Sequence, residues 1–130
     1  MSDELEQQLE AERQGNPFLV YRAGTGSQVI VNLGDVGGRF TVGRGSAIDI
    51  SLDWDTDVSR LHAALECIAD YWTVVDDGLS RFGTFLNEER VTGRRRLSDG
   101  DVLRFGTTPV TFRAPGDSGA RSTRVADRPF

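Results

Sequence analysis

Two short segments of the chain combine residues that can bind an oxyanion. The first is Val58-Ser59-Arg60-Leu61-His62, and the second, further along the chain, is Asp77-Gly78-Leu79-Ser80-Arg81-Phe82-Gly83-Thr84. A Gly43-Arg44 pair precedes both segments and follows an alternation of apolar and polar residues. Arginine offers a charged fork of donors and serine offers a hydroxyl, so these residue types together suit a phosphate group.

Four residues are the candidate phosphate ligands: Arg44, Ser59, Arg60 and Arg81. A phosphate monoester carries between one and two negative charges near neutral pH and has three strong acceptor oxygens. Its binding site therefore needs several charged or hydroxyl donors that converge on one point. All four residues lie in predicted turns, and the loops at one end of a β-sandwich can bring distant turns together.

The residues between these turns alternate in the way that short β-strands do. Strand patterns cover residues 18–21, 29–31, 39–42, 48–52, 63–68, 71–75, 84–86, 102–105 and 110–112. The most regular, Ile48–Leu52, predicts a half-buried strand with Ile48, Ile50 and Leu52 facing inward. Turns such as Asp76-Asp77-Gly78 and Asp99-Gly100 separate the strands. Short strands without a convincing helix among them predict an all-β sandwich.

The order and spacing of these motifs resemble the forkhead-associated (FHA) domain of bacterial type. The Asn87 turn and the closing segment Leu97-Ser98-Asp99-Gly100-Asp101-Val102-Leu103-Arg104-Phe105-Gly106 belong to the resemblance, which covers roughly Pro17 to Arg113. It implies a sandwich of two twisted, mainly antiparallel sheets with about 10–11 short strands. It also implies a non-catalytic module that binds phosphothreonine peptides of partner proteins in Ser/Thr kinase signalling.

The resemblance assigns roles to most residues of the two segments. It implies phosphate contacts from Arg44, Ser59, Arg60 and Arg81, and peptide or pocket contacts at Ser80 and Phe82. It implies structural support from Gly43, His62, Gly83 and Thr84, with His62 tying the binding loops together through hydrogen bonds.

Phe82 departs from the family pattern, which has Asn at this position. The family's Asn hydrogen-bonds the main chain of the bound peptide beside the phosphothreonine, and a phenyl ring can neither donate nor accept such bonds. Two interpretations follow. Phe82 packs against an apolar residue beside the phosphothreonine, or the domain has become a phosphate-independent protein-interaction scaffold. A peptide pair that differs only in phosphorylation distinguishes them.

Composition narrows the classes of partner. The net charge of −5 is unevenly placed, with acids concentrated in residues 1–14 and arginines in residues 113–130. Nucleic-acid-binding domains usually show a basic stripe, so no nucleic-acid partner is expected. Arg94-Arg95-Arg96 has no interleaved aromatic residues and predicts a solvated hairpin edge. The chain shows no secretory signal and no apolar run of membrane-spanning length, so we expect a cytoplasmic protein without a membrane partner.

Other chemistries have weaker support. The acidic loop Asp53–Asp57 lacks the glycine and distal glutamate of a calcium-binding loop, so neither a metal nor another cofactor is expected. The single cysteine, Cys67, predicts a small core residue. A hydrolase using Ser59 or Ser80 with His62 and an Asp is a further alternative, but no nucleophile elbow surrounds either serine. Turnover of a generic ester that is lost in a Ser59→Ala variant would support it.

The two ends of the chain are expected to flank the sandwich of residues 15–114. Residues 1–14 form an acidic leader with a helix-capping start at Ser2, and this leader is either solvated or docked on a partner or on another part of the protein. Residues 115–130 are rich in Gly, Ser, Arg and Pro and predict a flexible tail or the start of a linker. Thr123, once phosphorylated, is an alternative ligand for the domain's own pocket.

Overall fold

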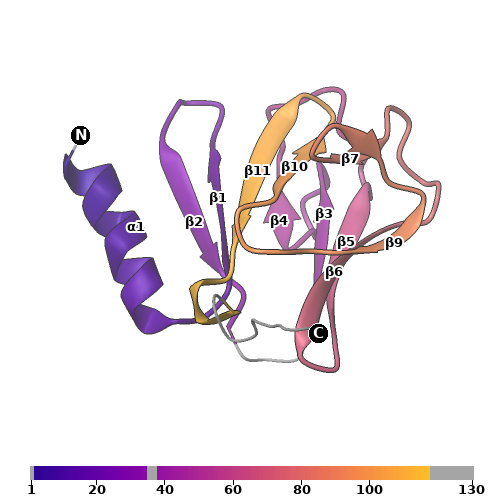
Figure 1. Ribbon diagram of the computed structural model, residues 1–130. Coiled ribbons are helices and arrows are strands. Elements are labelled where there is room, and N and C mark those ends of the chain that lie inside the picture. Colours follow the sequence, from indigo (N-terminus) through magenta and orange to yellow (C-terminus); the bar gives the residue numbers. More distant parts are fainter. Residues whose placement is uncertain (1, 35–37, 118–130) are drawn as a thin grey trace.

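The computed structural model describes residues 2–34 and 38–117, which form one helix, eleven strands and a short 3-10 turn (Figure 1). In chain order the elements are α1 (Ser2–Gln14), β1 (Phe18–Arg22), β2 (Gln28–Asn32), β3 (Arg39–Gly43), β4 (Ile50–Ser51), β5 (Ala63–Ile68), β6 (Tyr71–Asp76), β7 (Thr84–Leu86), β8 (Glu89–Arg90), β9 (Gly93–Arg96), β10 (Val102–Phe105), β11 (Thr108–Arg113) and η1 (Pro115–Asp117).

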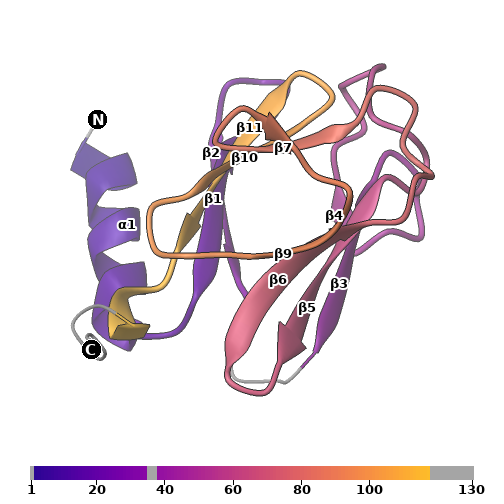
Figure 2. The ribbon, with the colours of Figure 1, turned by 45° about the vertical axis from the view of Figure 1, so that its right-hand side comes forward.

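The strands form two sheets that pack face to face (Figures 1 and 2). One sheet has six antiparallel strands in the order β2-β1-β11-β10-β7-β8. The other has five strands in the order β4-β3-β5-β6-β9, and only its β3–β4 pair is parallel. The prediction of a sandwich of mainly antiparallel sheets is therefore confirmed.

The core fills the space between the sheets because alternate residues of each strand point inward. In β1 the inward residues are Leu19 and Tyr21, and the strand pairing places them opposite Phe112 and Val110 of β11. All four are buried, and the second sheet contributes a matching set: Val42, Leu65, Trp72 and Val74. Burying one such side chain contributes about 1.5–3 kcal/mol, so the period-two pattern stabilises this register strongly.

The strand predicted over Ile48–Leu52 is shorter than its alternation suggests. Only Ile50 and Ser51 form β4. Asp49 instead pairs through its side chain, because its carboxylate accepts bonds from the amide and hydroxyl of Thr41 at 2.9 and 3.0 Å. Ile50 and Leu52 are buried as expected, whereas Ile48 is half-buried in the preceding turn. A side chain has replaced the backbone ladder at this sheet edge.

Two strands have no apolar alternation that could have predicted them. β8 pairs with β7, and β9 pairs with β6, so both lie at sheet edges. The Arg94-Arg95-Arg96 run lies in β9, which is an edge strand, and an edge position was predicted for it. Its arginines contact the protein: Arg94 bridges to Glu66 at 2.9 Å, and Arg96 lies over the Tyr71 ring at 4.4 Å.

The predicted leader is α1, which lies along β2, and Arg22 pairs with Glu4 at 2.7 Å. The predicted tail begins with η1, and its residues 118–130 lie outside the described part of the chain. Among the described residues, no helix is both long and apolar enough to cross a bilayer.

Candidate functional site

The end of β3 and the loop before β5 are bonded together at Gly43 and Arg44. The Arg44 amide donates to the carbonyl of Ser59 at 3.0 Å, and the Arg44 Nε donates to the carbonyl of Val58 at 2.8 Å. Gly43 makes this approach possible, because a Cβ at this position would overlap the carbonyl oxygen of Arg60. Arg44 is exposed, and none of the described residues accepts a bond from its two terminal guanidinium nitrogens. These nitrogens are available to a ligand.

Ser59 is held by three hydrogen bonds to three different parts of the site. Its amide donates to Nδ1 of His62 at 3.0 Å, and its carbonyl accepts from the Arg44 amide. Its Oγ accepts from the amide of Arg81 at 2.9 Å. No described residue accepts the hydroxyl hydrogen of Ser59, so this fixed serine retains one donor for a ligand.

His62 connects the two segments from the interior. The ring is 1% exposed, and Nδ1 accepts the Ser59 amide bond. The ring hydrogen therefore lies on Nε2, which donates to the carbonyl of Gly83 at 2.9 Å. The edge of the ring also meets Phe105, with 5.9 Å between the ring centres. Because Nδ1 accepts from the Ser59 amide and not from its hydroxyl, His62 does not activate Ser59 as a nucleophile.

The connection between β6 and β7 is held by Asp76. The Ser80 hydroxyl donates to one carboxylate oxygen at 2.6 Å, and the Gly78 amide donates to the other at 2.8 Å. Burial raises the pKa of Asp76, but these hydrogen bonds outweigh it, so the pKa lies below its ordinary value. Ser80 is 9% exposed and points into the protein, so its hydroxyl supports the loop. Thr84 is fully buried at the start of β7.

Three arginine side chains of the candidate site reach the surface. Arg44, Arg60 and Arg81 are all exposed, and none of them is paired with a carboxylate within the described residues. Arg81 lies over the ring of Phe82, with its Cζ 5.3 Å from the ring centre. Phe82 is itself 48% exposed. The structure thus places a phenyl ring at the surface beside the arginine whose amide holds Ser59.

Arg90 is a further arginine near the site that the sequence did not single out. Gly83 has a φ of +93°, and a Cβ built on it would lie 2.8 Å from the guanidinium carbon of Arg90. Glycine is suited to this position because of both the backbone angle and the close approach. Arg90 reaches Gly83 from β8, which follows β7 in a hairpin, and this fold contact has no signature in the sequence.

Asp55 is the second residue that the sequence analysis missed. This carboxylate is 5% exposed and accepts bonds from the Asp57 amide, from the amide and hydroxyl of Thr107, and from the Thr108 hydroxyl, at 2.6–2.9 Å. It anchors the loop before Ser59 to the turn between β10 and β11. The acidic loop is thus a structural brace, and the described residues hold no group of three side chains that could bind a metal ion.

Residues of both segments line a small hollow at the surface. Leu61 and Leu79 are exposed leucines of the two segments, and both line this hollow together with Arg39 and Asp77.

Hydrogen bonds bring most of the predicted site residues together. Arg44 and Arg81 each donate a backbone amide bond to Ser59, the first to its carbonyl and the second to its Oγ. His62 and Gly83 support this group, and Arg60 follows Ser59 in the same loop.

Comparison with known families and sequences gives one match. The family model described as FHA domain matches residues 40–106. A search of curated proteins finds no significant match to the chain.

Solved structures are similar over most of the chain. The crystal structure of the FHA domain of CT664 from Chlamydia trachomatis is 27% identical, with a TM-score of 0.67, and the match covers 75% of this chain and 95% of that one. The FhaA FHA domain, complexed with the intracellular domain of Rv3910, is 28% identical, with a TM-score of 0.62, and covers 75% and 100%. A structure from an analysis of phosphothreonine-dependent FHA domain interactions is 29% identical, with a TM-score of 0.61, and covers 75% and 94%.

Proposed function

The chain belongs to the FHA-domain family of non-catalytic phosphothreonine-binding modules, and on that basis we propose that it binds phosphothreonine in a partner protein. One observation supports this most directly. Ser59 and the backbones of Arg44 and Arg81 are bonded into one unit, while no described residue accepts a hydrogen bond from the Ser59 hydroxyl or from the terminal guanidinium nitrogens of Arg44. The unit is complete before any ligand arrives, and preorganisation of this kind lowers the cost of binding.

The phosphate would lie where these donors meet. Ser59 donates its hydroxyl hydrogen to one phosphate oxygen, and Arg44 donates from its terminal nitrogens. Arg60 and Arg81 add positive charge from the two flanking loops. Hydrogen bonds to charged groups contribute about 1.5–3 kcal/mol each, so each donor changes affinity roughly ten- to a hundredfold.

The biological setting that we propose is Ser/Thr kinase signalling in the cytoplasm. Similar structures include an FHA domain complexed with the intracellular domain of another protein and one analysed for phosphothreonine-dependent interactions. The partner of this chain is then a protein phosphorylated on threonine. Thr123, which lies outside the described residues, is the alternative ligand within the chain itself.

Phe82 changes how the peptide around the phosphothreonine would be held. A phenyl ring replaces main-chain hydrogen bonds with an apolar surface, and the exposed Leu61 and Leu79 extend the apolar character of the two loops. We therefore expect the preferred ligands to carry an apolar residue beside the phosphothreonine. The same exposed side chains favour the second candidate function, a scaffold that binds a partner without phosphate.

A titration with matched peptides tests the proposal. A phosphothreonine peptide selected from a degenerate library, its unphosphorylated twin and its phosphoserine twin are each titrated into the full chain. We expect only the phosphothreonine peptide to bind tightly, and Arg44→Ala to weaken it at least tenfold. Arg96→Ala is the matched control, because Arg96 is also an exposed arginine without a carboxylate partner in the described structure, but lies on β9.

The outcomes separate the two candidate functions. Equal affinity for the phosphorylated and unphosphorylated twins would favour the scaffold and contradict phosphate recognition. The second pKa of a phosphate monoester is about 6, so the phosphate loses negative charge below that pH and binding through it should weaken. The affinity of a phosphate-independent scaffold for its partner should not fall with the protonation of phosphate.

A further inference from the structure

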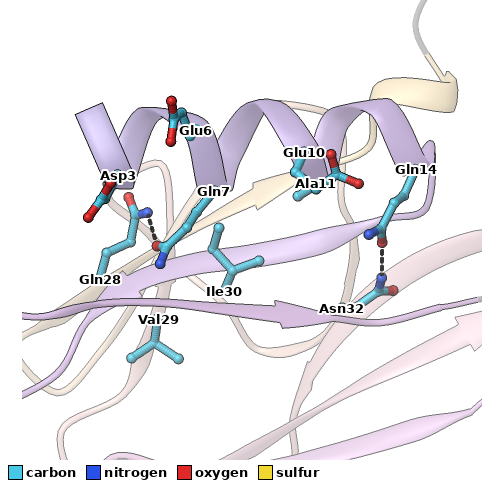
Figure 3. Close-up of a pocket in the computed structure, with 10 residues that line it drawn as sticks. All are labelled: Asp3, Glu6, Gln7, Glu10, Ala11, Gln14, Gln28, Val29, Ile30 and Asn32. Carbon is cyan, nitrogen blue, oxygen red and sulfur yellow. Dashed lines mark hydrogen bonds between the residues drawn. The ribbon is translucent and has the colours of Figure 1, made fainter. Parts of the chain in front are cut away.

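An open hollow on the described surface lies far from the proposed phosphate site, between α1 and β2 (Figure 3). Its volume is about 780 Å³, and its walls are one face of α1 and the edge strand β2. In both ribbon views α1 and the β6–β7 connection lie on opposite sides of the sandwich (Figures 1 and 2). We call this hollow the α1–β2 groove. Its lining residues are Asp3, Glu6, Gln7, Glu10, Ala11, Gln14, Gln28, Val29, Ile30 and Asn32.

Amide side chains fix the two walls of the α1–β2 groove. Gln28 donates to Gln7 at 3.0 Å near the start of α1, and Asn32 donates to Gln14 at 3.0 Å near its end (Figure 3). Ile30 lies between these contacts and points toward the helix (Figure 3). The helix and the strand are therefore attached at both ends of the groove, which keeps it open between them.

β2 has one unpaired edge in the described structure. It pairs with β1 on one side, and it is the terminal strand of its sheet. A free strand edge presents backbone donors and acceptors to any extended segment that reaches it, and adding a strand is a common mode of peptide binding. The floor of the α1–β2 groove therefore suits an extended chain.

The α1 wall gives the groove a negative charge. Asp3, Glu6 and Glu10 all line it, and none of the lining residues is basic. Asp3 and Glu6 make no ion pair within the described residues, whereas Glu10 pairs with Arg13 of the same helix at 2.6 Å. Two carboxylates are thus without a cationic partner at the surface, and an occupant with arginines would neutralise them.

The chain's own C-terminal segment has the complementary charge. Residues 118–130 contain three arginines, Arg121, Arg124 and Arg128, and one acid, Asp127. The described part of the chain ends next to the groove, because Gly116 lies against the carbonyl of Gly15, directly after α1. An ion pair of 2.8 Å between Arg113 and Glu12 ties the end of β11 to the same helix.

The segment is also long enough to follow the whole groove. Thirteen extended residues span at most about 43 Å, at about 3.3 Å each. α1 has 13 residues, and a helix of that length measures about 20 Å. A chain that leaves η1 meets the Asn32 end of β2 first, so it would run antiparallel to β2.

We propose that residues 118–130 dock in the α1–β2 groove as an extended strand on the edge of β2, with their arginines facing the acids of α1. The contact is intramolecular, so a weak interaction suffices to populate it. This docking is independent of the proposed phosphate recognition. A docked tail would hold Thr123 away from Ser59 and leave the phosphate site open to a partner.

A spin label on the tail tests the contact in the full chain. The label is attached to Ser122→Cys in a Cys67→Ser background, and backbone amide signals are recorded by NMR with the label oxidised and reduced. We expect loss of intensity for the amides of β2 and of the facing side of α1. We also expect the β2 amides to exchange their hydrogens more slowly in the unmodified chain than in a variant whose tail charge is reversed by Arg121→Glu and Arg124→Glu.

Charge reversal identifies the groove as the site. Reversing the groove with Glu6→Arg and Glu10→Arg should abolish the broadening, and so should reversing the tail with Arg121→Glu and Arg124→Glu. Combining both pairs should restore it. Glu89→Arg, an exposed charge reversal on β8, is the control and should change nothing.

Three results would overturn the proposal. One is broadening that the reversals do not alter, and another is broadening centred on any surface other than β2 and α1. The third comes from mixing spin-labelled chains with unlabelled, isotope-enriched chains: broadening of β2 in that mixture would show that the tail of a second copy occupies the groove.

Discussion

Replacing Ser59 with alanine should separate phosphate binding from folding. The Ser59 Oγ accepts the Arg81 amide at 2.9 Å, and its hydrogen is free within the described structure. Losing the donor to phosphate removes about 1.5–3 kcal/mol of binding energy, which is roughly a ten- to hundredfold fall in affinity. Losing the internal bond costs about 0.5–1.5 kcal/mol of stability, because this bond is between uncharged groups.

Two measurements on the same variants check both numbers. Isothermal titration with the selected phosphothreonine peptide gives the affinity, and urea unfolding gives the stability. Ser59→Thr keeps the hydroxyl and should retain most of the affinity, and Ser27→Ala, in the exposed turn between β1 and β2, should change neither quantity. If Ser59→Ala binds within twofold of the unmodified chain while Arg44→Ala does not, the hydroxyl does not contact phosphate and this reasoning is wrong.

Three further changes address the fold, the peptide and the pH dependence. Gly43→Ala places a methyl group against the Arg60 carbonyl and should cost about 1–3 kcal/mol in urea unfolding, so an unchanged midpoint would contradict the close approach. Phe82→Asn should weaken binding of the selected phosphopeptide about two- to tenfold, because the apolar contact between the ring and the peptide is lost; unchanged or stronger binding in the same titration would show that the ring does not contact the peptide. Burial raises the pKa of Asp55, but hydrogen bonds from Thr108 and its neighbours outweigh it and hold the pKa below the ordinary 3.8. Its stabilising contribution is therefore present above that ordinary value and is lost as the pH falls through the lower folded-state pKa. Asp55→Asn should reduce stability near neutral pH and flatten its fall on acidification between about pH 5 and pH 2, which urea unfolding at a series of pH values measures.

The sequence predicted most strands because one face of each is buried. The alternation around Leu19 and Leu65 indicates the inward face directly, since a shift of one residue would expose it. β8 and β9 could not be found in this way, because their residues are polar and pair at sheet edges. The alternation around Ile48 predicted too long a strand, because a side chain can bond to a neighbouring strand in place of the backbone.

The site shows a similar division between residues with local motifs and residues defined only by the fold. Arg44, Ser59 and His62 stand in recognisable motifs, so their places in the chain could be predicted. Asp55 could not be assigned, because its hydroxyl partners Thr107 and Thr108 lie 52 and 53 residues away. No property of the acidic loop indicates which distant turn it will meet. The sequence could argue against a metal site in this loop, but it could not distinguish a buried brace from a solvated charge.

The position of Phe82 in this network explains how the residue at position 82 can change without disturbing the hydrogen-bonded unit that we propose binds phosphate. The bonds that hold Ser59 come from the Arg81 amide, the Arg44 amide and the His62 ring, and none of them involves the side chain at position 82. That side chain is therefore free to change without moving a phosphate donor. Main-chain bonds to a peptide are worth about 0.5–1.5 kcal/mol each, and the charged bonds to phosphate about 1.5–3. Substituting Phe for Asn should then alter which peptides bind more than whether phosphate is required.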